Sequence, residues 1–563
     1  MSRSVYRNDA LREITYPPDA KRSLYSMLEF GARHATNKAQ AILYYNKSIS
    51  YGDLLEQVQA CAAGLYTLGV RKGDHITIFL PNIPQCVVAV YAVNRLGAVA
   101  NLVHPLSTKS ELAYAVTLTE SRYILATEIN EGHCTGLGAE IIRCKTAGYF
   151  PQTLKGVILR AGLAYSVRKY PRAANVIEWT DLMKNGRLQM EAGNGLPDDT
   201  GSPDDTAAIM YTGGTTGQPK GVMLTNGAIN FTATWLINHY ANTDAHIGDA
   251  LLAILPVFHA FGLAVVIHVP LSAGLRILLI PRFNPKECAK LAVKEKVSYL
   301  AGVPVIYERM YPFLKDHDCS FVKHAVCGGD KVTADLLNRY NALLKDETGR
   351  LKFQPGYGLT ESCGSCAVTK MDYTEFIDGS VGTPFSGMEY CLVEPGTTDV
   401  LLNDAEGEIC FRGPSIMQGY YKNEAATKDV MRKHDDGKIW LHTGDVVTLA
   451  GGDTIVFRSR YKRMVKINGI NVYPTLIENT MENCPFIREV CAVAVPWKND
   501  RRIKLYVTLK DPAADHGEAS EKIMEYARNN LNHWSTPFAV SILDAMPLTK
   551  MNKTDYRVLE KRG

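Results

Sequence analysis

Residues Ala207 to Leu224 read A-A-I-M-Y-T-G-G-T-T-G-Q-P-K-G-V-M-L. The apolar ends, 207–211 and 222–224, predict two buried strands, and the middle is rich in glycine and threonine. Glycines allow successive N–H groups to point into one concavity, which suits phosphate oxygens. The threonine hydroxyls add hydrogen-bond donors, and Lys220 adds a positive charge. The stretch therefore predicts a phosphate-binding loop between two strands.

This loop differs from the Walker A phosphate loop. Pro219 precedes Lys220 and Gly221 follows it, whereas a Walker A loop has glycine before the lysine and serine or threonine after it. We expect Thr225 and Asn226 to cap a helix only after the second strand, so no helix dipole is implied at the base of the loop. The alternative is a flexible glycine hairpin that binds no ligand.

Helix and strand patterns alternate on the amino-terminal side of the loop. Residues 53–68 have apolar side chains at helical spacing, 75–80 form a short apolar run, 87–96 are helical again and 99–103 are extended. This alternation predicts an α/β fold with layered, largely parallel β-sheets and helices. The segment 193–205, rich in Gly, Pro and Asp, is expected to be an exposed linker.

On the carboxyl-terminal side, the longest uncharged run extends from Leu251 to Leu275 and is long enough to span a bilayer. Proline and histidine residues interrupt it, so we expect a buried strand–turn–helix–strand segment instead. Further on, Gly451-Gly452-Asp453 predicts a turn before a strand at 454–457, and a basic run follows at 458–466. The remaining chain has the size of a small α+β domain.

Length, charge and cysteine content limit the class of protein. The 563 residues are too many for one compact core and indicate two to four structural units. A formal net charge of +4 gives no reason to expect nucleic acid as a partner, and contact with a membrane surface stays open. The 13 cysteines are scattered and odd in number, which predicts reduced thiols in a cytoplasmic protein. Cys363 and Cys366 form a C-x-x-C that we expect to be structural, because no second pair accompanies it.

A series of motifs follows in order along the chain. They are Tyr211 to Gly221, Pro256-Val-Phe-His-Ala-Phe-Gly262, Gly356-Tyr-Gly-Leu-Thr-Glu361, Gly407 to Tyr420, His442-Thr-Gly-Asp445, Arg460 to Glu478, and Pro547 to Lys553. Together they resemble the motifs of the adenylate-forming superfamily, which holds acyl-CoA synthetases, nonribosomal peptide adenylation domains and beetle luciferases. The resemblance spans nearly the whole chain, and the chain looks most like bacterial-type fatty-acid CoA ligases.

The resemblance implies a large amino-terminal AMP-binding domain, residues 1–461, made of layered β-sheets with helices. It also implies a small, mobile α+β carboxyl-terminal domain, residues 462–563. The active site would lie between the two domains, and the hinge would fall near Lys462.

The reaction of this superfamily joins a carboxylate to the α-phosphorus of ATP, so the site must neutralise negative charge and align the attack. The resemblance implies that Lys553 contacts the carboxylate and the α-phosphate, that Thr360 contacts the α-phosphate, and that His259 lies at the mouth of the acyl pocket. A structural role for His259 is an equal alternative. Mg²⁺ prefers one or two carboxylates together with phosphate oxygens and water, and by resemblance Glu361 is its ligand.

The resemblance also implies a set of residues that bind ATP and AMP. Tyr357 would stack on adenine, Asp445 would accept the ribose hydroxyls, and Arg460 would reach the nucleotide, although a surface ion pair is the alternative for the last two. The full set is Thr212, Gly213, Gly214, Thr215, Thr216, Gly217, Lys220, Gly328, Gly329, Gly356, Tyr357, Gly358, Asp445 and Arg460.

Coenzyme A would approach through a tunnel lined by Lys466 and Gly469, and the alternative for this pair is a solvated charged turn. Some positions depart from the pattern of the superfamily. Ser459 and Asn552 replace glycines, Gly213 replaces a common serine, and Lys462 stands where many members have aspartate. These changes put the domain geometry in doubt, but they remove no charged catalytic group.

The candidate acyl segment, 251–275, contains no acidic residue that could pair with a substrate ammonium, and it offers Phe258, Phe261, Leu263, Val265 and Val266. An unpaired ammonium in a buried pocket would cost several kcal/mol. We therefore expect an apolar acid as substrate, with a fatty acid favoured over an aryl acid.

The predicted protein is a magnesium-dependent ligase that uses ATP to form an acyl-AMP and then transfers the acyl group to coenzyme A. One alternative is an enzyme that loads a separate carrier protein. An alternative of another class is a nucleotide-binding regulator without catalysis.

Overall fold

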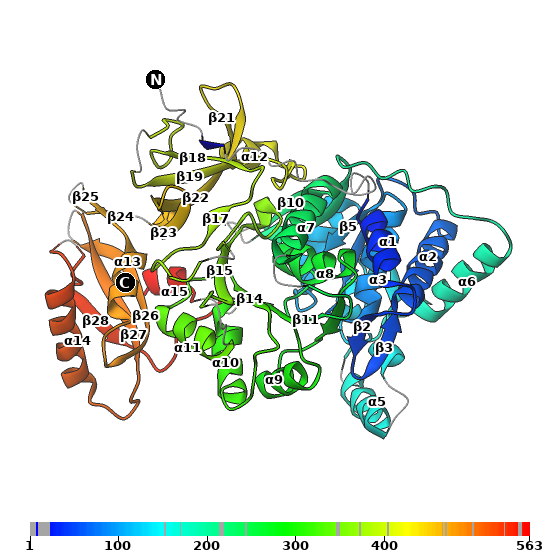
Figure 1. Cartoon of the computed structure of the whole chain (residues 1–563), viewed down its shortest axis with the longest axis horizontal. Helices are drawn as coiled ribbons and strands as arrows, with labels where there is room; N and C mark the ends of the chain where they lie inside the picture. Colours follow the sequence, from blue (N-terminus) through cyan, green and yellow to red (C-terminus); the bar gives the residue numbers. More distant parts are fainter. Residues whose placement is uncertain are drawn as a thin grey trace.

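The computed structural model describes residues 7–8, 23–150, 154–168, 170–212, 219–241, 245–344, 349–370, 373–401, 405–463, 465–467, 470–497, 500–533, 535–549 and 554–562. Within these ranges the chain forms two large, mainly parallel sheets with helices, an antiparallel sheet and a smaller carboxyl-terminal part (Figure 1). The α/β fold predicted from the alternation of patterns is confirmed.

The first large sheet has the strand order β20-β10-β9-β5-β4-β6-β7-β8. The strands from β9 to β8 pair in parallel, and β10 pairs antiparallel with β9. Its strands are β4 (His75–Phe79), β5 (Val99–Leu102), β6 (Tyr123–Ala126), β7 (Glu140–Arg143), β8 (Val176–Glu178), β9 (Thr206–Thr212), β10 (Lys220–Thr225) and β20 (Gly419–Tyr420). The helices of this part of the chain are α2 (Tyr51–Thr67), α3 (Pro84–Arg95), α4 (Lys109–Thr119), α5 (Leu154–Val167), α6 (Trp179–Glu191) and α7 (Asn226–Ala241).

The second large sheet has the order β17-β16-β15-β14-β13-β11-β12-β2-β3, with parallel pairing from β15 to β2. Its strands are β2 (Gln40–Tyr44), β3 (Lys47–Ser50), β11 (Ala250–Ala253), β12 (Arg276–Leu279), β13 (Tyr299–Gly302), β14 (His324–Cys327), β15 (Phe353–Tyr357), β16 (Ala367–Val368) and β17 (Thr383–Pro384). The helices of this part are α1 (Leu24–Ala35), the π-helix η4 (Phe261–His268), α8 (Val269–Ser272), α9 (Pro285–Lys294), α10 (Pro304–Leu314), α11 (Ala334–Leu344) and the short η5 (Thr360–Ser362).

Helix α2 shows how local sequence produces these elements. Ser50 and Asp53 form a capping box, in which each side chain binds the other residue's backbone N–H. Leu54, Val58 and Leu65 follow at helical spacing and are fully buried. Gly69 ends the helix region with a φ of 90°. The helix predicted over 53–68 is therefore confirmed, with its start two residues earlier.

The uncharged run from Leu251 to Leu275 forms β11, the π-helix η4 and α8, and leads into β12, as a buried segment. This agrees with the expected strand–turn–helix–strand segment. In the described part of the chain, no helix combines the length and the apolarity that a bilayer crossing needs.

A third, antiparallel sheet contains β18, β19, β22 and β21 in order, with β1 and β23 at its margins (Figure 1). Its elements are β1 (Arg7–Asn8), β18 (Glu389–Val393), β19 (Gly407–Arg412), α12 (Glu424–Val430), β21 (Met431–Lys433), β22 (Ile439–Ala450) and β23 (Thr454–Arg460). The turn predicted at Gly451-Gly452-Asp453 joins β22 to β23.

The carboxyl-terminal elements have a hydrophobic core of their own, built around residues such as Ile477, Leu505 and Ile523. The elements are η6 (Tyr461–Arg463), β24 (Val465–Ile467), β25 (Ile470–Val472), α13 (Pro474–Met481), β26 (Ile487–Trp497), β27 (Asp500–Leu509), α14 (His516–Asn530), β28 (Ala539–Ile542) and α15 (Tyr556–Glu560). They lie beside α11 in Figure 1, and the Lys331 Nζ atom lies 3.6 Å from Glu482 Oε2 across this contact. The domain limits 1–461 and 462–563, with a hinge near Lys462, stay a proposal.

Candidate functional site

The predicted phosphate loop is the connection of a β-hairpin. Strands β9 and β10 pair antiparallel, and Thr212 lies opposite Lys220 where the hairpin opens into the loop. Helix α7 begins only after β10, and the Ala228 N–H donates to the Thr225 hydroxyl at 3.0 Å. The loop thus joins two strands, as expected. Five of the predicted phosphate-binding residues, Gly213, Gly214, Thr215, Thr216 and Gly217, lie outside the described residues.

Tyr420 connects the lysine of this hairpin to the predicted magnesium ligand. The Lys220 ammonium lies 4.8 Å from the centroid of the Tyr420 ring. The Tyr420 hydroxyl donates to Glu361 Oε1 at 2.8 Å. Tyr420 therefore contacts a cation through its ring and a carboxylate through its hydroxyl. A cation close to a carboxylate suits a charged phosphate ligand and its counter-ion. Tyr420 ends the motif Gly407 to Tyr420, but the sequence did not indicate a role for this residue.

A cavity of about 210 Å³ brings together several segments that the sequence placed in the site. Nine residues of the predicted site and acyl segment line it, and they come from the ends of β14 and β15, from η5, and from η4 and the turn before it. These residues are His259, Gly328, Gly329, Gly356, Tyr357, Gly358, Thr360 and, in the predicted acyl segment, Phe261 and Val265. The predicted adenine-binding and acyl-binding segments thus share one cavity.

Gly358 explains why this turn requires glycine. A Cβ atom at position 358 would lie 2.5 Å from the backbone carbonyl carbon of Gly364. Such a distance is shorter than real Cβ contacts, so a larger residue would force the turn apart. The close approach keeps Tyr357 and Thr360 at the cavity wall.

Part of the predicted acyl segment lines the cavity and part does not. Phe261 and Val265, four residues apart on η4, face the cavity. Leu263 and Val266 are buried in the core, and Phe258 packs against the His104 ring at a centroid distance of 4.4 Å. Of the five apolar residues that the segment offers, Phe261 and Val265 reach the cavity, because a helical segment turns only one face to a cavity.

The remaining apolar wall comes from segments that sequence reasoning did not connect with the site. Helix α7 and the ends of β13, β14 and β16 supply it. The residues are Leu236, Tyr240, Val303, Val326 and Val368. A single sequence gives no signal for these contacts, since they come from four separate elements.

Asp445 is fully buried and contacts Tyr357, a residue of the cavity wall. Its Oδ2 atom accepts a hydrogen bond of 2.6 Å from the Tyr357 hydroxyl. Burial raises the pKa of the Asp445 carboxyl above its usual range, although the nearby Arg460 guanidinium and the Tyr357 hydroxyl act in the opposite direction. Burial also raises the pKa of Tyr357. Asp445 and Tyr357 are thus both shielded from water.

Arg460 pairs with the other oxygen of this carboxylate. Its Nε atom lies 2.8 Å from Asp445 Oδ1, and the two residues face each other across β22 and β23. The Arg460 side chain is 53% exposed, whereas Asp445 is inaccessible. The ion pair that was the alternative interpretation is therefore present, but its carboxylate is buried against Tyr357 and does not lie at the surface. Asp445 raises the pKa of the Arg460 guanidinium.

The carboxyl-terminal members of the predicted site are not tested by this geometry. Lys462 belongs to η6 and Lys466 to β24, but the structure describes neither side chain. Gly469 and Lys553 lie outside the described residues. Their roles stay predictions.

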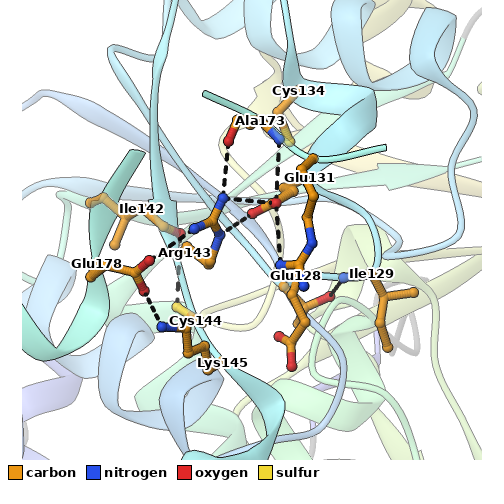
Figure 2. Close-up of polar contacts among 12 residues, drawn as sticks. Glu128, Ile129, Glu131, Cys134, Ile142, Arg143, Cys144, Lys145, Ala173 and Glu178 are labelled. Carbon is orange, nitrogen blue, oxygen red and sulfur yellow. Dashed lines mark hydrogen bonds and ion pairs between the residues drawn. The ribbon is translucent and has the colours of Figure 1, made fainter. Parts of the chain in front are cut away.

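A larger cavity, of about 560 Å³, lies near β7 and β8. Figure 2 shows that Arg143, one of its charged lining residues, is fully engaged: it donates to Glu131 at 2.9 Å, to Glu178 at 2.8 Å and to the Ala173 carbonyl at 3.0 Å. Glu178 also pairs with Lys145 at 3.1 Å. These charges compensate one another, so the arrangement connects β7 and β8 and leaves none of these groups unpaired.

All 13 cysteines are free and buried. Burial raises the pKa of the Cys363 and Cys366 thiols, the latter to about 12, which makes them poor nucleophiles. This agrees with the structural role expected for the C-x-x-C pair.

Comparisons with known proteins agree with this architecture. A family model described as AMP-binding enzyme matches residues 30–421, and one described as AMP-binding enzyme C-terminal domain matches residues 476–553. A long-chain-fatty-acid–CoA ligase from Escherichia coli O157:H7 is 30% identical over 583 residues, which covers 99% of this chain and 98% of the relative. A 4-coumarate–CoA ligase from Humulus lupulus is 28% identical, with 91% and 89% covered.

Among solved structures, the anthranilate CoA ligase AuaEII in complex with anthranoyl-AMP matches with a TM-score of 0.81. Its sequence is 17% identical, and the match covers 98% of each chain. At this identity the likeness shows the fold alone.

The fold is thus that of enzymes that activate acids as adenylates. The chain belongs to the AMP-binding enzyme family, whose model covers more than half of its length. The predicted reaction, ATP-dependent formation of an acyl-AMP followed by a CoA thioester, is confirmed at the level of this class.

Proposed function

We propose that this enzyme joins an apolar carboxylic acid, with a fatty acid as the first candidate, to coenzyme A at the expense of MgATP. The observation that carries the choice of acid is the wall of the cavity of about 210 Å³. None of its described lining residues is acidic or basic apart from His259. An amino-acid ammonium would lose its hydration there without gaining a carboxylate partner.

The roles of the site residues are part of this proposal. The β9–β10 hairpin with Lys220 would hold the phosphates, and Asp445 would accept the ribose hydroxyls. Thr360, which lines the cavity wall, would donate to the α-phosphate. Lys553 would neutralise charge as the carboxylate attacks the α-phosphorus, with pyrophosphate leaving on the opposite side.

Magnesium fits the donor set at Glu361. In the described part of the chain, Tyr420 is the residue that donates to this carboxylate, through Oε1. One carboxylate beside the phosphate-binding lysine is the arrangement Mg²⁺ commonly uses, with phosphate oxygens and water completing its shell. The ion would neutralise phosphate charge when bound. We further propose a reducing, cytoplasmic compartment, which the buried free thiols support.

A panel of acids tests the substrate. Saturated fatty acids of graded length, 4-coumarate and the proteinogenic amino acids would be compared in ATP–pyrophosphate exchange and in CoA-dependent AMP release. We expect exchange with fatty acids, with an optimum in chain length. Exchange restricted to amino acids would reject the apolar-acid proposal, and a clear preference for 4-coumarate would replace fatty acids by aryl acids.

The acceptor is tested separately, because adenylation does not depend on it. We expect free coenzyme A to drive stoichiometric AMP release and thioester formation after the acyl-AMP has formed. Release that requires a phosphopantetheinylated carrier protein and ignores free coenzyme A would favour the carrier-loading alternative.

Lys553→Ala separates catalysis from nucleotide binding. We expect the variant to bind ATP with nearly unchanged affinity, measured by calorimetry, and to lose pyrophosphate exchange by about 100-fold or more, because a charge that acts in the transition state is removed. Lys561→Ala, eight positions further on, is the control and should keep full exchange. A wild-type chain that binds ATP but shows no exchange with any acid would support the regulator alternative.

A further inference from the structure

A buried cluster of cysteine and histidine lies in the antiparallel sheet, and the proposed reaction gives none of its side chains a role. Potential ligand atoms of Cys410, His434 and His442 all lie within 4.8 Å of one another. Cys410 is fully buried, and His434 and His442 are 4% and 5% exposed. Burying three such groups together requires compensation, either by hydrogen bonds or by a bound cation.

Strand register creates the cluster. Cys391 on β18 lies opposite Cys410 on β19, and Cys410 lies opposite His442 on β22. Residues directly opposite in an antiparallel pair point to the same face, so these three side chains form a row across three neighbouring strands, which Figure 1 labels. His434 follows β21 and reaches the row from the turn before β22, with its ring stacked on Trp440 at 5.6 Å.

The contacts within the cluster point to a ligand. The Nε2 atoms of His434 and His442 lie 2.9 Å apart, and Cys391 Sγ lies 4.0 Å from His434 Nδ1. The Nδ1 atom of His442 makes no hydrogen bond among the described residues, yet Glu408 Oε2 lies 3.5 Å from it. A carboxylate behind the outer nitrogen of a histidine is the usual support of a metal-bound imidazole.

We propose that Cys410, His434 and His442 bind a Zn²⁺ ion through one thiolate sulfur and the two Nε2 atoms. A water molecule would take the fourth position, because Cys391 Sγ lies 4.0 Å from His434 Nδ1, on the side of the ring away from the ligating Nε2. Zinc bonds of roughly 2.0 Å to nitrogen and 2.3 Å to sulfur require ligand atoms roughly 3.3 to 3.8 Å apart in a tetrahedron. The two Nε2 atoms, 2.9 Å apart, would separate by roughly 0.4 Å, and the other ligand atoms, which lie within 4.8 Å, would approach by up to roughly 1 Å.

The proton balance of binding is simple. The two imidazoles stay neutral, because the proton between their Nε2 atoms moves to an Nδ1 atom, so that each ring carries its proton on Nδ1. The Cys410 thiol loses its proton to solvent, and one proton is released per ion. The Nδ1–H of His442 then faces Glu408.

Zinc binding here would stabilise the backbone turn at Thr443 and Gly444, directly before Asp445. Glu408 Oε1 accepts a hydrogen bond of 2.9 Å from the Gly444 N–H, directly before Asp445. The Thr443 hydroxyl accepts a hydrogen bond from the Asp445 N–H at 3.1 Å. The zinc ion would therefore be structural. The zinc site would be the same whichever carboxylic acid the enzyme activates.

Cobalt substitution tests the site directly. The full-length protein would be treated with a chelator, freed of it and titrated with Co²⁺. We expect one equivalent to bind, with a thiolate-to-cobalt charge-transfer band and the visible bands of tetrahedral cobalt. Zn²⁺ should displace it and raise the melting temperature. A wild-type protein without these bands, or one that Zn²⁺ does not stabilise, would overturn the proposal.

Variants assign the ligands. Cys410→Ser should abolish the charge-transfer band, and His434→Gln should weaken binding by at least about tenfold. Cys288→Ser, at another buried cysteine, is the matched control and should behave as wild type. If Cys410→Ser does not fold, His434→Gln, which lies on a turn, decides alone. Unchanged cobalt spectra and affinity in a folded ligand variant would refute the assignment.

Discussion

At the scale of single residues, the surroundings of the Asp445 carboxyl group determine what it can bind. It is fully buried, and it meets the Tyr357 hydroxyl on one oxygen and the Arg460 guanidinium on the other. Burial raises its pKa, and hydrogen-bond donors oppose this effect because they stabilise the charged carboxylate. Two ribose hydroxyls would be such donors.

Asp445→Asn is therefore expected to weaken ATP binding. A hydrogen bond to a charged acceptor contributes about 1.5–3 kcal/mol, which corresponds to a rise of roughly tenfold or more in the KM for ATP. Pyrophosphate exchange with ATP, 2′-deoxyATP and 3′-deoxyATP measures it, because the wild type should discriminate among these nucleotides and the variant should not.

Tyr357→Phe is the control for this prediction. It keeps the carboxylate and removes one donor, so discrimination between ATP and the deoxynucleotides should persist. If Asp445→Asn still discriminates like the wild type, Asp445 is not the ribose acceptor.

At the scale of elements, the crossing of α2 and α6 depends on two glycines. A Cβ atom at Gly186 would lie 1.8 Å from the Ala60 carbonyl oxygen, and one at Gly64 would lie 2.5 Å from the Leu182 carbonyl oxygen. The two helix backbones therefore touch, which only glycine permits. Apolar periodicity predicted α2, but nothing in it indicated this close contact.

Gly186→Ala is expected to destabilise the protein although alanine favours helices. The added methyl group must push α6 away from α2, at a cost of about 1–3 kcal/mol. Urea unfolding should show a lower midpoint with an unchanged slope.

Gly162→Ala in α5 is the matched control, because a Cβ atom there meets nothing within 4 Å. It should be neutral or stabilise by up to about 1 kcal/mol through helix propensity. A Gly186→Ala variant as stable as the wild type would show that the helices can separate freely.

At the scale of the whole molecule, the carboxyl-terminal part has its own core and meets the rest through contacts such as Lys331 with Glu482. An exposed polar contact of this kind is compatible with the proposed rotation of this part about Lys462. Lys331 follows the Gly328-Gly329 segment of the cavity, so the rotation would also change the surroundings of the site.

Lys462→Pro tests the hinge, because proline fixes φ and restricts the preceding residue. If two orientations serve the two half-reactions, acyl-AMP formation should remain close to wild type. CoA-dependent AMP release should fall by at least about tenfold. Lys462→Ala leaves φ free and should preserve both steps. An equal loss of both steps in Lys462→Pro, or of neither, contradicts the hinge proposal.

Stability of the whole chain should fall on acidification because of buried histidines. Burial lowers the pKa of His239 and His268 to about 3 and that of His324 to about 4, from a value of 6.5. Between the lowered pKa of each histidine and its usual value of 6.5, the unfolded chain binds a proton at that histidine and the folded chain does not. The free energy of unfolding should therefore fall by up to about 1.4 kcal/mol per pH unit for each histidine as the pH drops below about 6.5.

Urea unfolding at about pH 7 and about pH 5 measures this slope. His268→Gln should reduce it, because His268 makes its hydrogen bonds to Tyr91 and Asn230 as a neutral ring. His516→Gln, at an exposed histidine, should leave the slope unchanged. A His268→Gln slope equal to that of the wild type would contradict the role assigned to this histidine.

The sequence by itself determined the α/β class and the hairpin with its glycine-rich connection, and the resemblance of its ordered motifs indicated the family and nine residues of the cavity wall. The class and the hairpin depend on apolar patterns within short segments, such as 207–211 and 222–224, and the family depends on motifs that are each contiguous along the chain. Only the tertiary structure decided which face of η4 reaches the cavity, that Tyr420 stands between Lys220 and Glu361, and that Cys391, Cys410 and His442 form one row. Strand register and helix rotation set those contacts between distant segments, and a single sequence carries no local signal for either.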